Sequence, residues 1–361
     1  MISLLVVNYR SAALTADAVR TARSATSSPL QVVIVDNSCD EREAEALLGI
    51  AETLIVSRTN RGYAGAINDG RRACSGETMV VSNPDVTFAP ESIDRLADAI
   101  GGGTAVAGPA IFWDDAHRWR LPPGDLLTAP QKIDEVLASR SPAWREQWDR
   151  RRIRKRMAFW SLDATTAMDM LSGAVMAIRT EDFDAIGGFD ERFALYFEET
   201  DFLRRVAARR RHIAYVPAAR CRHIFNQSAS QAGAVAAARY AESELKYLEK
   251  WNGPFVAQML KRIERPMPPV ILSEVEGSPE LGRRSFDFAQ DDILVEASPL
   301  ATFATAAGRF ASSGSAPASA AAMTPIDIPA EVRRSLRGEP LYLRVVVRRT
   351  AEVLATYKIS P

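Results

Sequence analysis

The sequence predicts an α/β fold with a mostly parallel, Rossmann-like central sheet flanked by helices. In the first hundred residues, short apolar runs rich in β-branched residues alternate with Ala-rich segments of helical period. Continuous apolar strands joined by helical crossovers are typical of a sheet that is covered on both faces. A length of 361 residues with 47% hydrophobic and 25% charged content suits a globular protein with a large core.

Four strand–helix units are expected in order along this region. The apolar runs predicted to form strands are residues 2–7, 30–35, 53–56 and 78–82. The segments predicted to form the helices that follow them are residues 12–25, 41–48, 65–73 and 90–100. The same reasoning predicts a strand near 176–178, a helix at 198–208 and a strand at 213–216.

Composition excludes several function classes. Lys+Arg and Asp+Glu both number 45, so the overall charge does not indicate a nucleic-acid partner. Three widely spaced cysteines without a CxxC pair argue against a disulfide framework or a structural zinc site, and they favour a reducing compartment. The apolar start is too short for a signal peptide, and no run of eighteen apolar residues occurs. We therefore expect a cytoplasmic protein without a membrane span.

Polar residues stand where each predicted strand ends. They are Asn8-Tyr9, Asp36-Asn37, Asn60-Arg61-Gly62 and Asn83-Pro84-Asp85. Helix capping would explain one such corner, whereas four at the carboxyl edge of a parallel sheet favour a shared binding site. Neither a GxGxxG nor a Walker loop is present, so a dinucleotide fold or a P-loop enzyme is not expected.

An acidic cluster lies in the middle of the chain. Glu198, Glu199 and Asp201 fall within four positions, directly after two aromatic residues. Such crowding raises carboxyl pKa values and suits a site that needs a tuned base. The alternative is an exposed acidic helix start, because carboxylates stabilise the positive end of a helix.

Residues 112–160 lose the regular alternation and are expected to form an irregular insert on the acceptor side. They hold Trp113, Trp119, Trp144, Trp148 and, at their end, Trp160. They also hold a basic run from Arg150 to Arg156, interpreted either as a solvated helix face or as a patch that meets an anionic acceptor or a membrane surface.

The rest of the chain suggests three parts. Residues 1–265 are expected to form one domain that ends in helices at 236–265. Residues 266–325 are predicted to be a flexible low-complexity linker, and the stretch 270–292 resembles translated genomic repeat elements that interrupt bacterial reading frames. Residues 326–361 are expected to be a short C-terminal segment with an isolated strand at 341–347.

Eight ordered motifs between about residues 2 and 250 resemble family 2 glycosyltransferases, most closely the rhamnosyltransferase-like branch. They are Val7-Asn8-Tyr9, Val35-Asp36-Asn37, Asn60-Arg61-Gly62-Tyr63-Ala64-Gly65 with Asn68, Asn83-Pro84-Asp85, Ser172-Gly173-Ala174, Gly187-Gly188-Phe189-Asp190-Glu191, Glu198-Glu199-Thr200-Asp201, and His223 to Ser228. The resemblance implies a GT-A fold and transfer of a sugar from a nucleotide donor.

The resemblance also implies roles for single residues. Asn8, Tyr9 and Asp36 would line the base and ribose pocket of the donor. The remaining donor-binding residues would be Asn60, Gly62, Asn68, Asn83 and Gly173, the last of which permits close backbone approach to the donor sugar or to a helix.

Metal and base roles are carried over in the same way. Asp85 takes the place of the metal-binding aspartate, and His223 that of a histidine that helps to hold metal or diphosphate. The cofactor would be a divalent cation, Mg²⁺ or Mn²⁺, because magnesium prefers oxygen ligands and manganese also accepts imidazole. Glu199 would be the general base, with Asp201 beside it in the catalytic cluster.

The function predicted is that of a metal-dependent inverting glycosyltransferase. The donor would be a dTDP- or UDP-linked sugar, with rhamnose suggested by the resemblance, and the acceptor a glycan or lipid-linked glycan. A lipid-linked acceptor would bring the protein to the membrane surface through residues 150–156. The alternative is a catalytically silent nucleotide-sugar-binding subunit of a polysaccharide assembly complex. A nucleotidyltransferase would need a Gly-rich basic loop near the first strand, which the sequence lacks.

Overall fold

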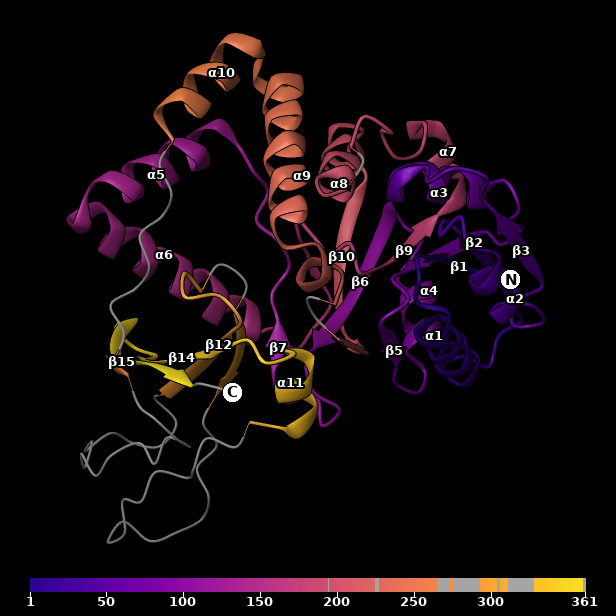
Figure 1. Cartoon of the computed structure of the whole chain (residues 1–361), viewed down its shortest axis with the longest axis horizontal. Helices are drawn as coiled ribbons and strands as arrows, with labels where there is room; N and C mark the ends of the chain where they lie inside the picture. Colours follow the sequence, from indigo (N-terminus) through magenta and orange to yellow (C-terminus); the bar gives the residue numbers. More distant parts are fainter. Residues whose placement is uncertain are drawn as a thin grey trace, which may run out of the picture. The chain divides into compact units, whose positions relative to one another are not determined.

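The computed structural model is described here over residues 1–193, 195–224, 227–264, 273–274, 293–303, 306–310 and 328–359. The chain, drawn whole in Figure 1, divides into two compact units. Unit 1 comprises Met1–Ile111, Pro123–Lys132 and Leu162–Ile263, and unit 2 comprises Phe112–Pro122, Ile133–Ser161 and Glu264–Pro361. Most of the insert at 112–160, which was predicted to lie within the domain 1–265, therefore belongs to unit 2.

Unit 1 is built on the sheet that the sequence predicts. Its strands run in the order β6 (Thr104–Phe112), β9 (Val175–Arg179), β4 (Thr78–Ser82), β1 (Ile2–Asn8), β2 (Leu30–Asp36) and β3 (Thr53–Val56). β1 is parallel to β2 and β4, and β2 is parallel to β3, while β9 is antiparallel to β4 and β6. The prediction of an α/β fold with a mostly parallel central sheet is confirmed.

Helices follow the first four parallel strands, as expected. They are α1 (Ala12–Ser24), α2 (Glu41–Ala46), α3 (Gly62–Arg71) and α4 (Ser92–Asp98). The strands carry apolar side chains on both faces because both faces are covered, and Leu4, Leu5, Val33 and Val80 are completely buried. Later helices of unit 1 are α7 (Thr180–Ile186), α8 (Glu198–Ala208), α9 (Gln227–Asn252) and α10 (Pro254–Ile263).

A long strand, β10 (His212–His223), extends the predicted strand at 213–216 by several residues. It pairs in antiparallel fashion with β5 (Val86–Phe88) and β8 (Thr166–Ala167). In this register His223 lies opposite Val86, the residue after Asp85. Pairing between distant segments thus brings the end of β10 to the turn that follows β4.

Unit 2 overturns the expectation of an irregular insert. Most of the insert forms two helices, α5 (Ala129–Arg140) and α6 (Pro142–Trp160), with the short strand β7 (Arg120–Leu121) before them. The start of helix α6 is capped, because the Ser141 side chain accepts a hydrogen bond from the Trp144 backbone N–H and Pro142 occupies the first turn.

The tryptophans of unit 2 are largely structural. Trp113, Trp119 and Trp160 are buried, and the Trp113 indole donates a hydrogen bond to Ser335 (3.0 Å). Gly308 lies so close to Trp160 that a Cβ at this glycine would be 2.5 Å from the indole ring. These three rings therefore fill the interior of unit 2 and are not exposed to an acceptor.

The C-terminal residues also differ from expectation. β12 (Ile293–Ser298) is antiparallel to β13 (Ala307–Phe310) and to β14 (Leu341–Val347), which in turn pairs with β15 (Glu352–Ile359). The strand predicted to be isolated therefore lies inside a sheet, and part of the predicted linker is β-structure. The shorter elements here are β11 (Ser273–Glu274) and α11 (Ala330–Ser335). The repeat-like stretch 270–292 lies outside the described residues except for 273–274.

The basic run is used mainly for contacts within the protein. Arg150 pairs with Glu146 and Arg151 with Asp134, each at 2.7 Å. Arg156 is buried against Glu296, whose other oxygen pairs with Arg344 at 2.6 Å. Burial raises the pKa of Glu296, but the two guanidinium groups outweigh it and hold the pKa below its usual value. The helix-face interpretation fits this pattern better than an open basic patch.

Candidate active site

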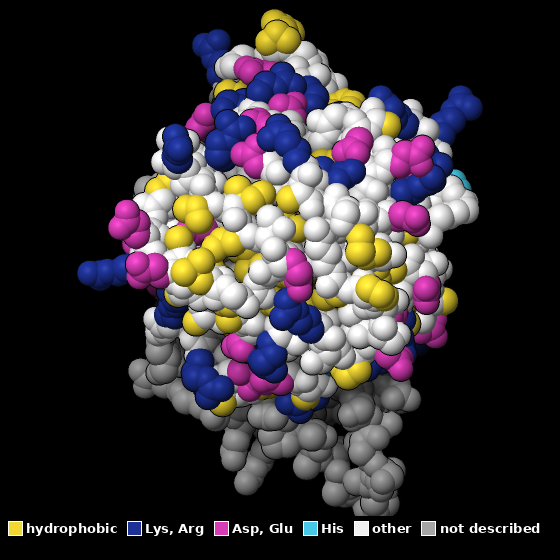
Figure 2. All heavy atoms as spheres, turned by 90° about the vertical axis from the view of Figure 1, so that its right-hand side faces the viewer, with side chains coloured by type: hydrophobic (Ala, Val, Ile, Leu, Met, Phe, Trp, Pro, Cys, Tyr) yellow, Lys and Arg dark blue, Asp and Glu magenta, His cyan; other side chains and the backbone are white. Residues whose placement is uncertain are grey.

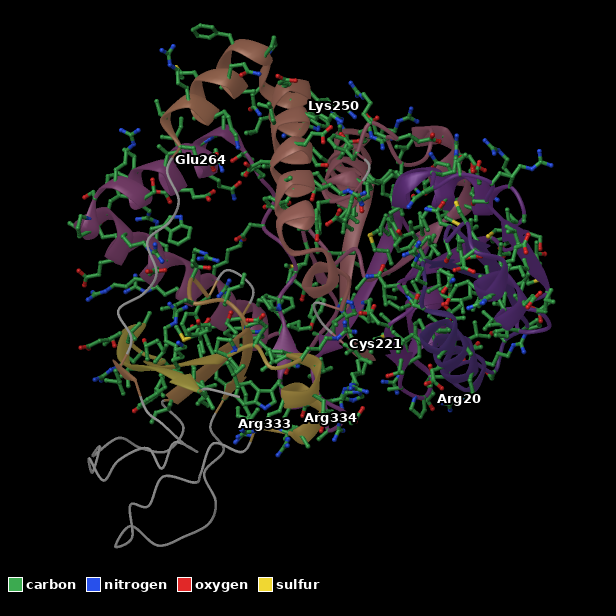
Figure 3. All side chains as sticks on the ribbon, in the orientation of Figure 1. Arg20, Cys221, Lys250, Glu264, Arg333 and Arg334 are labelled. Carbon is green, nitrogen blue, oxygen red and sulfur yellow. The ribbon has the colours of Figure 1, made fainter. Side chains whose placement is uncertain are left out.

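Asp85 and His223 meet at the carboxyl edge of the sheet. The His223 Nε2 atom lies 3.1 Å from Asp85 Oδ1, and the Ile224 N–H donates to the Asp85 carbonyl (3.0 Å). Both side chains are mostly buried, at 14% and 9% exposed. Cys221, two residues before His223, is also buried on β10 (Figure 3). The antiparallel pairing of β10 with β5 therefore assembles the two predicted metal ligands.

These two side chains fit a divalent cation that shares its coordination with a ligand. No cluster of three or more His, Cys, Asp or Glu side chains that could hold a metal ion occurs among the described residues. A carboxylate and an imidazole suit Mn²⁺, and nucleotide-bound ions of this kind take further oxygens from phosphate and water. The pair alone does not complete the coordination of such an ion.

The loop at Gly173 connects this pair to the acidic cluster. The Asn83 N–H donates to the Ala174 carbonyl (2.8 Å), which joins the turn before Asp85 to this loop. A Cβ at Gly173 would lie 3.0 Å from the Glu199 Cγ, so only glycine lets the loop approach this side chain without adjustment. Of the two alternatives for Gly173, the structure shows close approach to a helix.

Glu198 and Glu199 form the first turn of α8. The two residues before them, Tyr196 and Phe197, have φ values of 69° and 70°, a left-handed conformation that is unusual for such side chains. Burial, and then the charge of Glu199, raise the pKa of Glu198 well above its ordinary value. Burial also raises the pKa of Glu199. This raised proton affinity comes from desolvation rather than from Asp201.

The Tyr63 phenol is affected by the charges of both the acidic cluster and Asp85. Burial raises the pKa of Tyr63, and the charges of Glu198, Glu199 and Asp85 raise it further. All three carboxylates thus lie within electrostatic reach of a single hydroxyl group. Asp85 and Glu199, which are remote in sequence, thus act through their charges on the same phenol.

At the ends of β1 and β2, next to β4 in the sheet, Asn8 and Asp36 lie side by side and fully buried. The Asn8 Nδ2 group donates to Asp36 Oδ1 (2.9 Å), Ser38 Oγ (3.2 Å) and Glu43 Oε2 (3.0 Å), while its Oδ1 accepts from the Thr15 hydroxyl (2.9 Å). Asn8 is therefore occupied in holding the ends of β1 and β2. Asp36 Oδ2 is buried without a hydrogen-bond partner in the part of the chain described.

The loop before α3 is held by an asparagine that sequence reasoning left without a role. The Asn37 Nδ2 group donates to Asn60 Oδ1 (3.0 Å) and to the Gly62 carbonyl (3.2 Å), and Asn37 Oδ1 accepts from the Arg61 N–H (2.9 Å). Asn60 and Gly62 thus shape this loop. Tyr9 is 51% exposed, and its predicted contact with the donor remains a prediction.

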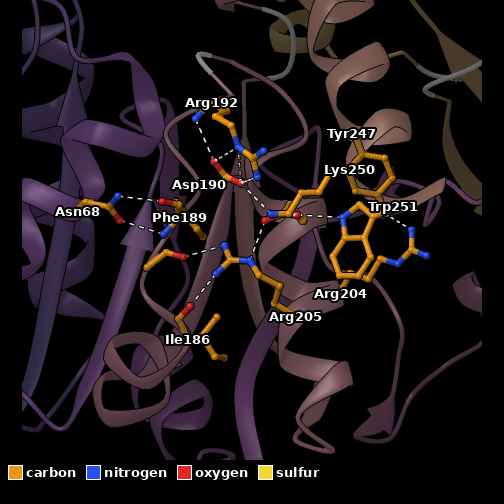
Figure 4. A network of polar contacts seen from close by, with 12 residues as sticks. Asn68, Ile186, Phe189, Asp190, Arg192, Arg204, Arg205, Tyr247, Lys250 and Trp251 are labelled. Atoms are coloured by element: carbon orange, nitrogen blue, oxygen red, sulfur yellow. Dashed lines mark hydrogen bonds and ion pairs between the residues drawn. The ribbon is translucent and has the colours of Figure 1, made fainter. Parts of the chain in front are cut away.

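Asn68 is also engaged within the protein (Figure 4). Its Nδ2 donates to the Phe189 carbonyl (2.9 Å) and to Glu191 Oε1 (3.1 Å), and its Oδ1 accepts from the Phe189 N–H (2.9 Å). Both ends of the amide hold the loop 187–191 that precedes α8. The geometry supports a positioning role rather than the predicted contact with the nucleotide.

Asp201 does not join the catalytic cluster. It is completely buried, with Oδ1 bound to Lys250 Nζ (2.6 Å) and Trp251 Nε1 (2.9 Å), and Oδ2 bound to Arg205 Nε (2.7 Å). Figure 4 shows the network around these partners, and Figure 3 shows Lys250 on α9. Two positions along a helix turn a side chain by about 200°, so Asp201 faces away from Glu199. The catalytic role predicted for Asp201 is not supported.

Charges of both signs are interspersed on the face shown in Figure 2. The described residues contain no helix of the length and apolar character needed to cross a membrane.

Comparisons with known proteins found two matching family models and several relatives. A family model described as glycosyl transferase family 2 matches residues 3–186, and one described as N-terminal domain of galactosyltransferase matches 155–227. Two N-acetylglucosaminyl-diphospho-decaprenol L-rhamnosyltransferases, from Mycobacterium tuberculosis strains CDC 1551 / Oshkosh and ATCC 25618 / H37Rv, are each 26% identical over 220 residues, which cover 55% of this chain and 68% of theirs.

Other matches are shorter or more distant. An uncharacterized glycosyltransferase of Haemophilus influenzae is 30% identical over 101 residues, covering 28% of this chain and 34% of its own. A Pyrobaculum calidifontis mannosyltransferase, solved with GDP-Man and Mn²⁺, superposes with a TM-score of 0.45 at 17% identity over 73% of this chain and 68% of its own. The first family model spans half of the chain and includes the Asp36 and Asp85 motifs. The chain therefore belongs to glycosyl transferase family 2 and is a glycosyltransferase.

Proposed function

We propose that this enzyme is a metal-dependent, inverting glycosyltransferase that moves a sugar from a nucleoside diphosphate to a hydroxyl group of a glycan or lipid-linked glycan. The observations that support the proposal are the contact between His223 and Asp85, the packing of Glu199 beside Gly173, and the effect of both the Asp85 and Glu199 charges on Tyr63. The name of the mycobacterial relatives supports rhamnose as the sugar and a polyprenyl-linked acceptor. A dTDP- or UDP-linked donor is part of the proposal.

The donor's base would bind at Asp36. The buried Asp36 Oδ2 lacks a partner among the described residues, and a carboxylate oxygen accepts hydrogen bonds only. Uracil and thymine each carry an imide N–H that could donate to it, so this contact does not separate UDP from dTDP donors. At the other end, Asp85 and His223 would hold the cation, which supplies positive charge to the departing diphosphate.

Glu199 would act as the general base. The acceptor oxygen forms a bond to the anomeric carbon while the bond from that carbon to the phosphate oxygen breaks, and the diphosphate leaves with the electron pair. The acceptor proton passes to Glu199, whose burial raises its pKa and makes it a better proton acceptor. Attack opposite the leaving group inverts the anomeric centre.

The setting of the reaction also belongs to the proposal. We place the enzyme in the cytoplasm, in peripheral contact with the inner face of the membrane where a lipid-linked acceptor resides. The contact would be made by Arg150 and Arg151 of α6, which are about half exposed and would exchange their pairs with Glu146 and Asp134 for anionic headgroups.

Replacing Asp85 with alanine tests the cation end. The Asp85→Ala enzyme is expected to lose at least about 100-fold of its metal-stimulated nucleotide release, because the diphosphate would leave without its counter-charge. Release is measured with and without Mn²⁺ for the parent and for Asp98→Ala, which removes an exposed carboxylate from α4. Equal metal stimulation in all three proteins would contradict the assignment.

The acid limb of the pH profile tests the base. Glu199 accepts a proton only when ionised, and because its pKa is raised, activity should increase with pH through that higher value. The limb of kcat/KM should therefore lie above about 4.3, the ordinary pKa of a glutamic acid. Circular dichroism at each pH separates this effect from acid unfolding. A limb at the ordinary value would argue against a buried base.

A further inference from the structure

Tyr63 presents a buried hydroxyl group that the proposed reaction has not yet used. The residue lies in the first turn of α3, directly after the loop at Asn60, and its ring stacks on Phe189 with the centroids 6.5 Å apart and the planes at 26°. The hydroxyl oxygen is inaccessible to solvent and has no hydrogen-bond partner among the described residues. The stacked ring thus fixes a donor that is left unsatisfied.

An unsatisfied hydroxyl in this place is unfavourable. Leaving a buried polar group unpaired is destabilising, and most such groups in native proteins have partners. The surrounding carboxylates and burial both raise the pKa of Tyr63, so the phenol stays neutral and keeps its proton. It therefore remains a hydrogen-bond donor, and the charged groups that act on it, Glu198, Glu199 and Asp85, are carboxyl groups.

The chemistry of the donor decides what such a phenol would bind. Sugar hydroxyl groups can donate to the carboxylates, so they do not require a further donor from the protein. The diphosphate carries only acceptor oxygens, and hydrogen bonds to ionised acceptors are the stronger kind. Asp85, which lies within electrostatic reach of Tyr63, is the residue assigned to the diphosphate end of the site.

We propose that the Tyr63 hydroxyl donates a hydrogen bond to an oxygen of the donor's diphosphate and becomes satisfied only when the nucleotide is bound. This inference rests on the proposed function, because it needs a nucleoside diphosphate bound beside Asp85. It assigns a binding residue that the sequence motif alone did not single out, since only Asn60, Gly62 and Asn68 of that motif received roles.

The variant Tyr63→Phe removes the hydroxyl and keeps the ring that stacks on Phe189. Binding of dTDP and UDP, each with Mn²⁺, is measured by calorimetry for the parent, for Tyr63→Phe and for Tyr342→Phe in β14 as a matched control. The nucleotide that binds the parent is expected to bind Tyr63→Phe about tenfold more weakly, in keeping with loss of a hydrogen bond to a charged group. The ligand-free Tm should be unchanged or higher.

Each outcome decides between the claims. Equal nucleotide affinity for Tyr63→Phe and the parent would overturn this inference and leave the proposed function intact. A lower ligand-free Tm would show a structural hydroxyl and would overturn it too, as would weaker binding of the nucleotide sugar with unchanged binding of the nucleoside diphosphate. A parent protein that binds neither nucleotide would remove the proposed function and this inference together.

Discussion

Replacing Glu199 with glutamine is expected to lower kcat by about 10²–10⁴-fold while donor binding stays within twofold of the parent. Glutamine has nearly the same shape as glutamate, so the close packing of this side chain against Gly173 is retained. It cannot accept the acceptor's proton, however, and the transfer step loses its base. Donor affinity should persist because Asp36, Asp85 and His223 are unchanged.

Two measurements test the transfer step and donor binding separately. Single-turnover kinetics report the transfer step, and calorimetry with Mn²⁺ and the nucleoside diphosphate reports donor binding. The variant Glu181→Gln makes the same substitution at an exposed carboxylate of α7 and should behave as the parent does. Equal turnover by Glu199→Gln and the parent would remove Glu199 from the role of base. Binding without turnover in the parent itself would instead favour the silent-subunit alternative.

The variant Asp201→Ala should destabilise the protein rather than act on the chemistry. Asp201 holds Lys250, Trp251 and Arg205 at distances of 2.6–2.9 Å and is fully buried. Removing one member of a buried ion pair leaves its partners without compensation, which costs about 3–5 kcal/mol. Because Lys250 and Arg205 are each about one fifth exposed, we expect the lower end of that range.

Urea unfolding followed by circular dichroism measures this loss. The control is Asp184→Ala, which removes an ion pair with Arg71. The Asp184 carboxylate is 55% exposed. Exposed pairs contribute about 0–1 kcal/mol, so the control should unfold close to the parent. Stability equal to that of the parent, together with loss of turnover, would return Asp201 to the catalytic cluster.

The fold of unit 1 was predictable because its signals are local. Apolar runs and the helices between them follow one another in the sequence. The order of the strands in the sheet was not predicted, because β4 lies beside β1 rather than beside β3. The length of β10 was not predictable, since alternating residues such as Arg220 and Arg222 become strand only through pairing with β5. Unit 2 escaped prediction for the same reason, because its sheet joins the insert to segments near the C-terminus.

Some residues of the site were also predictable from the sequence, and others were not. The carboxyl-edge rule located Asp36 and Asp85, and the structure adds that His223 reaches Asp85 through β10. Sequence proximity misled for Asp201, whose partners Lys250 and Trp251 come from a distant helix. The buried partners of Asn8 and Asn68 could not be foreseen either, because a motif does not reveal which amides the protein satisfies internally.

The central claim is that a cation site at Asp85 and His223 and a base at Glu199 face one another across a single donor site. Crystals grown with Mn²⁺ and the nucleoside diphosphate that binds the parent would test it most directly through anomalous diffraction. A manganese peak in contact with Asp85 and His223, with the diphosphate on the side toward Glu199, is the predicted result. A manganese peak and a nucleotide bound away from these residues would contradict the account.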